Sequence, residues 1–149
     1  MTPTEFIAAI APSARASSAV TTVPASFTIA QAILESSWGL KAPGNNLFGI
    51  KADSSWRGAT VTVHTHEVIN GERVAIDARF RAYANWQGSM DDHGKFLLQN
   101  RRYNACFLCC EDSEKFAHAI AAAGYATDPD YAEKIISIIR HHNLKEFDT

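Results

Sequence analysis

The spacing of apolar residues divides the chain into a helical part, a hairpin and a second helical part. Before residue 39 and after residue 86, apolar residues recur at the spacing of an amphipathic helix. Between residues 60 and 81 they alternate with polar residues, which is typical of strands that bury one face. Asn70-Gly71 interrupts this stretch and is the strongest short signal for a hairpin turn. The pattern therefore predicts several helices with one inserted hairpin, an α+β fold.

Capping residues predict where the helices begin. The caps that we expect are Thr2 or Thr4, Ser26, Ser113 and Asp128. Pro12 lies inside the first helical repeat and has no backbone N–H, so we expect it to break or restart that helix. A separate helical piece would then run from Arg15 to Val20. The last helix aligns Tyr131, Ile135 and Ile139 on an apolar line.

The segment Ala30–Gly39 places one acid at the end of a mostly buried helix. From Ile29 to Leu34 every residue except Gln31 is apolar, and Glu35 follows Gln31 by four positions, so the two share a narrow polar line. Glu35 falls in the last turns, where the helix dipole disfavours an anion, and Trp38 would help to remove water from it. Both effects raise the pKa of the carboxyl, as a general acid requires. The alternative is an ordinary solvated glutamate.

A second acid, Glu67, lies on the apolar face of the predicted hairpin. With a two-residue turn, Glu67 stands opposite Val74 and Thr65 opposite Ile76. An acid on this face is costly unless a cavity or a partner receives it. Glu72 is the alternative second acid, but it stands beside the turn, where a solvated side chain is expected. The other face of the return strand carries Arg73, Asp77, Arg79 and Arg81.

Composition indicates one soluble folded domain that spans residues 1–149. The hydrophobic fraction of 46% and the charged fraction of 20% are ordinary for a globular protein. A net charge of −2 argues against binding to nucleic acid or to an anionic membrane. No apolar run reaches transmembrane length, and the N-terminus has no basic region before an apolar stretch, so we expect no membrane insertion and no signal peptide.

The cysteines and histidines indicate neither a disulfide framework nor a metal site. Cys106, Cys109 and Cys110 are odd in number and too close together for ordinary bridges. No second pair of ligands completes a zinc site, so we expect free thiols, synthesis in a reducing cytoplasm, and no metal or cofactor. His64 and His66 alternate onto the solvent face of the hairpin, where we expect surface residues.

Four short motifs follow one another within residues 20 to 142. They are Ala30–Gly39 (AQAILESSWG), Asn45–Lys51 (NNLFGIK), Phe80–Tyr83 (FRAY) and Ala123–Pro129 (AGYATDP). This set resembles the glucosaminidase family of peptidoglycan hydrolases (glycoside hydrolase family 73 type), in its order and its spacing. The family includes flagellar muramidase-type domains and many bacterial and phage autolysins.

The resemblance implies a lysozyme-like fold with a helical lobe, a small β-hairpin lobe and a cleft between them. It puts Glu35 at the general-acid position, Glu67 at the position of the β-lobe acid, and Tyr125 at the tyrosine near the cleft. Two carboxylates, one from each lobe, would then flank a glycosidic bond. No cofactor is implied.

Aromatic and amide side chains in or near these motifs are candidates for sugar binding. Aromatic rings suit the apolar faces of sugars, and hydroxyl or amide groups add hydrogen bonds. The candidates are Asn46, Phe48, Tyr83 and Trp86. For Phe48 and Trp86 the alternative is core packing, and for Asn46 it is capping of its own loop.

The implied activity is that of an endo-β-N-acetylglucosaminidase that cuts the glycan strands of peptidoglycan. Glu67 would act as a base, a nucleophile or a charge stabiliser, or would only assist if the substrate acetamido group takes part. A muramidase, a lytic transglycosylase and a non-catalytic wall-binding module are the alternatives. A chain filled by one catalytic domain looks like a monomeric phage or prophage endolysin. It would be made in the cytoplasm, released by a separate holin, and act on the cell wall in the periplasm.

Overall fold

The helix at the N-terminus, α1 (Pro3–Thr21), is continuous in the computed structural model, which describes residues 1–149. Thr2 caps it as predicted, in a capping box with Glu5. The prediction that Pro12 breaks this helix, with a separate piece from Arg15 to Val20, is wrong. A proline inside a helix removes one backbone hydrogen bond. Here α1 packs along α2 and α3 and buries one of its sides, and this packing offsets the lost hydrogen bond.

The central helix, α2 (Ala25–Ser36), is surrounded by the other helices, and residues 25–33 are all buried. Its cap is not the predicted Ser26, because no side chain caps it locally and Pro24 occupies the cap position. Ser26 instead donates from its backbone N–H (2.8 Å) and its hydroxyl (2.6 Å) to the carboxylate of Asp148. Asp148 ends the 3₁₀ turn Leu144–Asp148 at the C-terminus, so an anion from the far end of the chain stabilises the start of α2.

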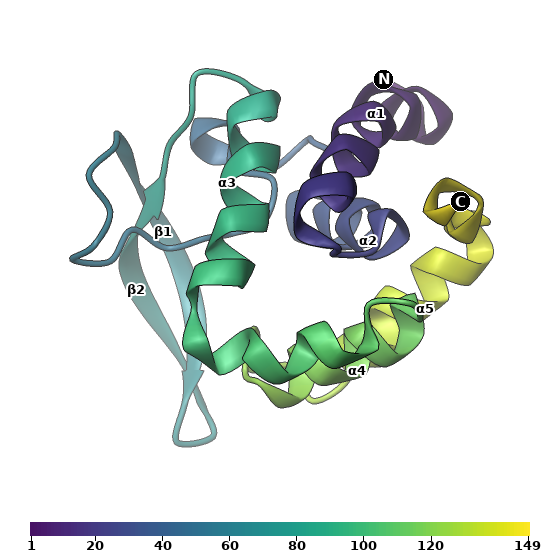
Figure 1. Cartoon of the computed structure of the whole chain (residues 1–149). Coiled ribbons are helices and arrows are strands. Elements are labelled where there is room, and N and C mark those ends of the chain that lie inside the picture. The colour runs from purple at the N-terminus through teal and green to yellow at the C-terminus, as the bar shows by residue number, and fades with distance from the viewer.

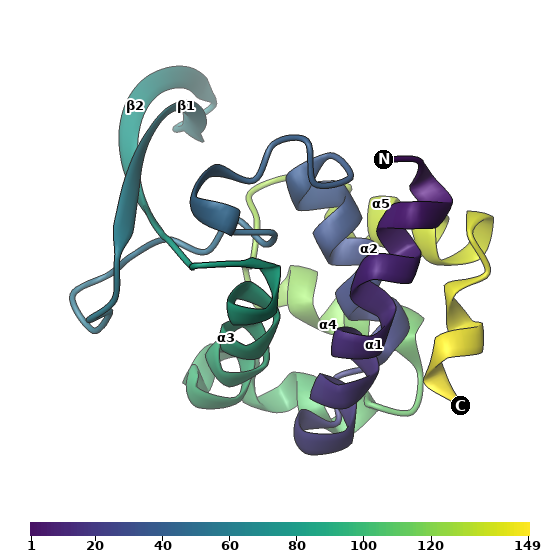
Figure 2. The same cartoon turned by 90° about the horizontal axis from the view of Figure 1, so that it is seen from above.

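The hairpin consists of β1 (Thr60–Ile69) and β2 (Glu72–Arg81) and has the predicted register. Glu67 pairs with Val74 and Thr65 with Ile76, and both turn residues have positive φ, as a tight hairpin turn requires. The hairpin projects from the helices beside α3 (Figures 1 and 2). The prediction of an inserted hairpin is therefore confirmed.

The second helical part contains α3 (Trp86–Gln99), a 3₁₀ stretch (Arg101–Cys109), α4 (Ser113–Ala122) and α5 (Tyr131–His141). Two predicted caps are displaced along the chain. Asp112, not Ser113, caps α4 by accepting two backbone N–H groups. Asp128 forms a local turn with the N–H of Asp130 and an ion pair with Lys134, and α5 starts only at Tyr131. In both places an aspartate side chain competes successfully for nearby backbone donors.

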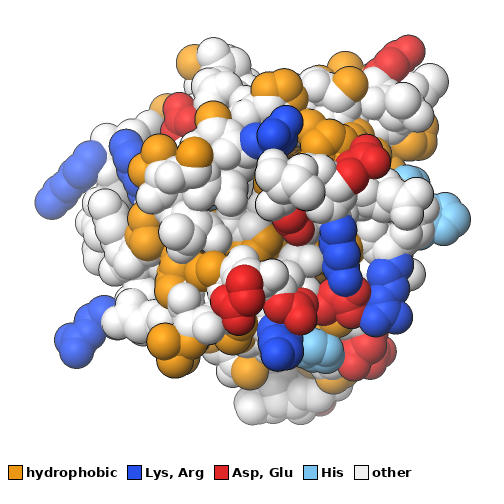
Figure 3. Space-filling view, turned by 45° about the vertical axis from the view of Figure 1, so that its right-hand side comes forward, with side chains coloured by type: hydrophobic (Ala, Val, Ile, Leu, Met, Phe, Trp, Pro, Cys, Tyr) orange, Lys and Arg blue, Asp and Glu red, His pale blue; other side chains and the backbone are white.

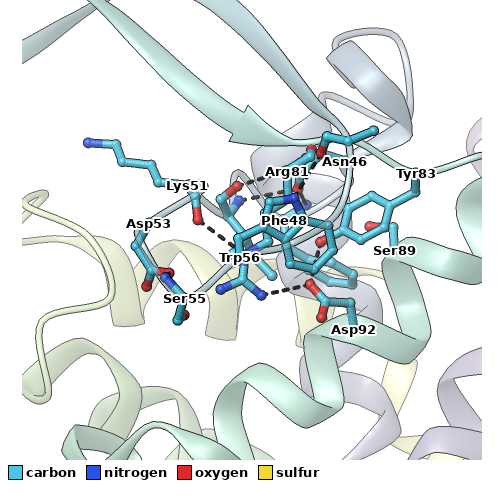
Figure 4. A network of polar contacts seen from close by, with 12 residues as sticks. Asn46, Phe48, Lys51, Asp53, Ser55, Trp56, Arg81, Tyr83, Ser89 and Asp92 are labelled. Atoms are coloured by element: carbon cyan, nitrogen blue, oxygen red, sulfur yellow. Dashed lines mark hydrogen bonds and ion pairs between the residues drawn. The ribbon is translucent and has the colours of Figure 1, made fainter.

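A polar network joins the hairpin to the helical lobe (Figure 4). Arg81, expected on the polar face with Arg73 and Arg79, is buried and forms an ion pair with Asp92 of α3 at 3.0 Å. Its guanidinium also lies 4.7 Å from the ring centre of Trp56, and the hydroxyl of Tyr83 donates to the same Asp92 carboxylate. The end of β2 is therefore fixed by charge and hydrogen bonds rather than by a hydrophobic core.

The surface carries charges of both signs without a dominant patch on the face drawn in Figure 3. Glu114, for example, pairs with Arg140 and with Lys145, and the hydrogen bonds lower the pKa of Glu114 to about 2. No helix has the length and apolar character needed to cross a bilayer.

Asp92→Ala should lower the free energy of unfolding by about 2–4 kcal/mol, because it leaves a buried guanidinium and the Tyr83 hydroxyl without their acceptor. Asp91→Ala is the matched control: Asp91 is the preceding, exposed residue and accepts only from Gln87 on the surface. It should change stability by less than about 0.5 kcal/mol. Urea denaturation at pH 7 measures both, and equal effects would contradict the assigned role of the network.

Candidate active site

A cleft of about 430 Å³ separates the hairpin from the C-terminal end of α2. Glu35 lies on its helical wall and Glu67 on its hairpin wall, and the loop between α2 and β1 supplies the floor. The other lining residues are Lys41, Pro43, Asn46, Gly49, Lys51, Val63, Thr65 and Phe80. A second hollow of about 480 Å³ shares Gly49, Lys51 and Glu67 with the cleft and extends to Tyr125. Because they share these residues, the two hollows form one continuous groove. A larger hollow, about 750 Å³, lies against α1 and contains neither acid.

Burial raises the pKa of Glu35 to about 7, from an ordinary value of 4.5. The backbone of Gly49 packs directly on the carboxyl: a Cβ at this position would lie 2.9 Å from Oε2 of Glu35. Gly49 also has a φ of +63°, which disfavours any side chain there. Trp38, expected to shield Glu35, packs its ring instead against Phe6 and His142. The predicted direction of the pKa shift is thus found, with Gly49 as the contacting group.

Tyr131 is a site residue that the sequence analysis missed. It is buried in α5, and its hydroxyl faces Glu35 and lowers the pKa of that carboxyl by hydrogen bonding, against the larger effect of burial. The hydroxyl also accepts a hydrogen bond of 2.9 Å from Nε2 of Gln31. The signal in the sequence was a tyrosine on an otherwise aliphatic helix line, because a buried tyrosine hydroxyl needs a partner.

Glu67 shares the cleft with Glu35, and the alternative acid Glu72 does not line it. Glu67 is half-buried and forms an ion pair with Lys51, which lies in the loop after α2. Glu72 begins β2 beside the turn and is exposed, as expected of a solvated side chain. The acid on the apolar face of the hairpin is therefore received both by a cavity and by a partner, either of which would offset the cost of its position.

Tyr125 lies in the link between α4 and α5 and lines the second hollow. Its hydroxyl donates to the backbone carbonyl of Phe48 at 2.8 Å, and its ring stacks on Tyr131 with 6.0 Å between ring centres. Burial raises its pKa well above the ordinary value, so the hydroxyl stays protonated. Tyr125 thus connects the floor of the cleft to the tyrosine that faces Glu35.

The four candidates for sugar binding have structural contacts of their own. Phe48 is fully buried and stacks on His93 at 3.8 Å, so its sugar-binding role is wrong and the core-packing alternative holds. Trp86 packs against Phe6, and Tyr83 bonds Asp92; neither lines the groove.

Asn46 lines the cleft but is buried, and its amide is occupied with its own loop and with β2. It donates to the carbonyls of Ile50 and Arg81, and it accepts from the N–H groups of Phe48 and Ile50. This is the loop-capping alternative.

The cysteines are free thiols, with Cys106 buried and Cys109 and Cys110 half-buried. The hydroxyl of Thr22 donates to Sγ of Cys110 at 3.3 Å. No three histidine, cysteine or acidic side chains come together in a geometry that would hold a metal ion. His64 and His66 are exposed, as predicted, and His64 forms an ion pair with Asp77.

Glu35→Gln should stabilise the fold at alkaline pH. Between pH 4.5 and about 7 the unfolded chain loses the Glu35 proton while the folded protein keeps it, so stability falls as pH rises through this window. The glutamine removes this penalty. The gain in free energy of unfolding should be about 2–3 kcal/mol larger at pH 8 than at pH 5, measured by chemical denaturation. A gain independent of pH would mean that Glu35 is not desolvated.

Gly49→Ala should reduce activity on the substrate by at least about tenfold, because the new methyl group would displace the Glu35 carboxyl and the backbone would be strained. The matched control is Gly71→Ala in the hairpin turn, which has a similar positive φ but nothing within 4 Å of the added methyl. It should cost stability without a comparable loss of activity per folded molecule.

Known proteins match this chain over most of its length. Residues 11–144 match the glucosaminidase family model, described as mannosyl-glycoprotein endo-beta-N-acetylglucosaminidase. The peptidoglycan hydrolase FlgJ of Vibrio parahaemolyticus is 41% identical over 91% of this chain and 46% of its own length. The exo-glucosaminidase LytG of Bacillus subtilis is 44% identical over 83% of this chain and 45% of its own length. The chain therefore spans about half the length of these relatives.

Solved structures agree as well. A peptidoglycan hydrolase from Sphingomonas sp. A1 (mutant form) matches with a TM-score of 0.83 and 34% identity over 96% of both chains. The catalytic domain of the autolysin Auto from Listeria monocytogenes matches with a TM-score of 0.82 and 31% identity, over 99% of this chain and 90% of the other. The predicted lysozyme-like α+β fold is confirmed, and the chain belongs to the glucosaminidase family (glycoside hydrolase family 73).

Proposed function

We propose that the chain is a peptidoglycan hydrolase that cuts the N-acetylglucosaminyl bond of the glycan strand, with Glu35 as the general acid. The observation that carries this proposal is a carboxyl with a pKa of about 7 that faces a groove lined on the opposite wall by a second acid. Near neutral pH such a carboxyl holds a proton that it can give to a leaving oxygen. The printed names of the family relatives, peptidoglycan hydrolase, exo-glucosaminidase and autolysin, support the substrate.

In this mechanism Glu35 donates its proton to the glycosidic oxygen as the bond between that oxygen and the anomeric carbon breaks. The bonding electrons go to the oxygen, and positive charge develops on the sugar ring in an oxocarbenium-like transition state. Water then adds to the anomeric carbon and loses a proton. That proton goes to Glu67 if Glu67 acts as the base, and Glu35 is then reprotonated from solvent; in the other routes the Glu35 carboxylate takes the proton and is restored as the acid. Gly49, packed against the carboxyl, limits the access of bulk water to Glu35.

Glu67 is the proposed second carboxylate, held on the hairpin wall by Lys51. It can orient the attacking water as a base, bond the anomeric carbon as a nucleophile, or stabilise the positive charge while the substrate acetamido oxygen assists. Tyr125 and Tyr131 support the acid side of the cleft, Tyr125 through its stacking on Tyr131 and Tyr131 through the Glu35 carboxyl. Of the sugar-binding candidates, Asn46 supports the site as the residue that shapes the cleft floor.

Activity on purified peptidoglycan tests the proposal. Wild type should release soluble fragments, and Glu35→Gln should be at least about 10³-fold slower, because the variant has no carboxyl proton to give to the leaving oxygen. Glu67→Gln should give an intermediate loss. The matched control is Glu72→Gln, which removes an exposed acid from the same hairpin and should leave the rate unchanged.

The products separate the possible bonds. A reducing N-acetylglucosamine end, identified by borohydride reduction and mass spectrometry, supports the proposal. A reducing muramic acid end would indicate a muramidase, and a 1,6-anhydro-muramic end a lytic transglycosylase. Binding to peptidoglycan without cleavage would indicate a wall-binding module.

The rate of peptidoglycan cleavage should decrease at alkaline pH, with a midpoint at the pKa of Glu35. The proton-donating form is lost as pH rises through about 7, so kcat/KM should decline above that pH. A rate that stays constant from pH 6 to pH 9 would contradict the role of Glu35 as the proton donor.

The cell wall is the proposed place of action, because its glycan is the proposed substrate. We also propose the monomeric endolysin role, with one catalytic domain over residues 1–149 and release by a holin. Expression in bacterial cells with and without a holin tests this role: lysis of the culture only when both are present is the expected result.

A further inference from the structure

Three buried polar side chains form a chain of hydrogen bonds behind the cleft. Gln31 and His93 are fully buried, and Tyr131 is 3% exposed. Nε2 of His93 lies 2.7 Å from Oε1 of Gln31, and Nε2 of Gln31 donates to the Tyr131 hydroxyl at 2.9 Å. The three residues come from α3, α2 and α5, so the hydrogen bonds cross the centre of the helical lobe. Buried polar groups of this kind are costly to keep unless each is paired.

The direction of donation along this chain follows from the groups themselves. Burial lowers the pKa of His93 to about 3, so the ring is neutral and carries one N–H. Oε1 of Gln31 can only accept, which puts that N–H on Nε2 and leaves Nδ1 as an acceptor without a partner. With the Gln31 amide reversed, the unpartnered group would be a buried N–H donor, and such donors are rarer in folded proteins than unpaired acceptors.

The orientation determines what Tyr131 offers to Glu35. The Tyr131 oxygen accepts a hydrogen from Gln31, so its own proton remains free to be donated. Glu35 stands one turn after Gln31 on the same side of α2, and the Tyr131 hydroxyl is bonded to Gln31, so this hydroxyl lies beside the Glu35 carboxyl. Donation to this carboxyl favours the ionised form, which is the form left after the proton has passed to the leaving oxygen. The chain of hydrogen bonds therefore stabilises the Glu35 carboxylate, the form that is left after the proposed proton transfer.

We propose that Gln31 and His93 are positioning residues, which fix the Tyr131 hydroxyl as a donor to the Glu35 carboxyl during proton transfer. This inference rests on the proposed role of Glu35 as the general acid. The ring of His93 is itself held by stacking on Phe48, whose backbone leads into Gly49. The segment Phe48-Gly49 therefore holds His93, at one end of the hydrogen-bond chain, and covers the Glu35 carboxyl at the other end.

The other groups around Glu35 do not supply the hydrogen bond that Tyr131 donates to it. The charged residues that face the cleft with it are Lys41 and Lys51 from the loop and Glu67 from the hairpin. Lys51 is paired with Glu67. Tyr125 donates to the Phe48 carbonyl, so its proton is already committed. This leaves Tyr131 as the buried donor on the acid side of the cleft.

The test compares Gln31→Met, Tyr131→Phe and the double variant, with kcat, KM and the pH profile measured for each. Gln31→Met should lower kcat about three- to tenfold with KM within about twofold, because the acid loses its fixed donor while the sugar contacts remain. The alkaline limb of the pH profile, where the rate falls as Glu35 ionises, should move to higher pH, because the Glu35 carboxylate is less stabilised. Tyr131→Phe should move it in the same direction and further.

Non-additivity distinguishes positioning from a general loss of stability. In the Tyr131→Phe background, Gln31→Met should cause no further shift of the alkaline limb, because Gln31 acts through the missing hydroxyl. An equal shift in both backgrounds, or no shift in either, would overturn the inference. A shift to lower pH in Tyr131→Phe would also overturn it, because Glu35 would then be the donor and Tyr131 the acceptor.

Two further variants keep the test decisive if Gln31→Met does not fold. Gln31→Glu is nearly isosteric and brings an acceptor for the Tyr131 proton, so it should draw that donor away from Glu35 and move the limb to higher pH. Ser26→Ala is the control: Ser26 is a fully buried polar residue at the other end of α2, bonded to Asp148. It should lower stability but leave the alkaline limb in place.

Glu35→Gln separates the two proposals. If it remains as active as wild type, the proposed function fails and the inference fails with it. If it is inactive while Gln31→Met and Gln31→Glu both retain the wild-type kcat and pH profile, only the inference fails.

Discussion

The burial of one carboxyl at the end of α2 is the constraint on which the rest of the structure depends. Burial moves the pKa of Glu35 from 4.5 to about 7, so the folded protein bears a cost whenever this group ionises. The fold tolerates the cost because residues 25–33 of α2 are buried among the other helices and anchor the end that carries the acid. Gly49 then completes the enclosure with its backbone, without a side chain that would displace the carboxyl. A residue useful for proton transfer is thus held in place by packing that does not itself take part in chemistry.

The second acid depends on a different kind of interaction. An isolated two-stranded hairpin is at best marginally stable in water, and this one has few helix neighbours. Its base is fixed by the Arg81–Asp92 ion pair and by the Asn46 amide, which bonds both the cleft loop and β2. The register of the strands then determines that Glu67 faces the cleft. The distance between the two acids is therefore set by a polar joint between lobes, which makes Asp92 and Asn46 part of the geometry of the cleft without lying next to the reacting bond.

Local patterns in the sequence were sufficient where the structure is local. Alternation and Asn70-Gly71 predicted the strands, their register and the inward face that carries Glu67. The four-residue spacing of Gln31 and Glu35 predicted their shared line, and the end of the helix predicted the direction of the pKa shift. Predictions were wrong where contacts with a segment distant in the sequence determine the local structure. Asp148 replaces a local cap at Ser26, packing of α1 retains Pro12 in a helix, and His93 rather than a sugar covers the ring of Phe48. Tyr131 was missed because a helical repeat shows which side is buried but not which hydroxyl meets which acid.

The two walls of the cleft give their acids different surroundings, and this difference favours different roles. Glu35 is enclosed by the backbone of Gly49 and by the neutral hydroxyl of Tyr131, which supplies no counter-charge. Glu67 is half-exposed and paired with Lys51, so it has both water and a cation nearby. A buried carboxyl without a counter-charge keeps its proton to a higher pH, as Glu35 does. The cleft thus has a buried acid with a raised pKa on one wall and a lysine-paired acid on the other, and this asymmetry is what the proposed cleavage of a glycosidic bond between them relies on.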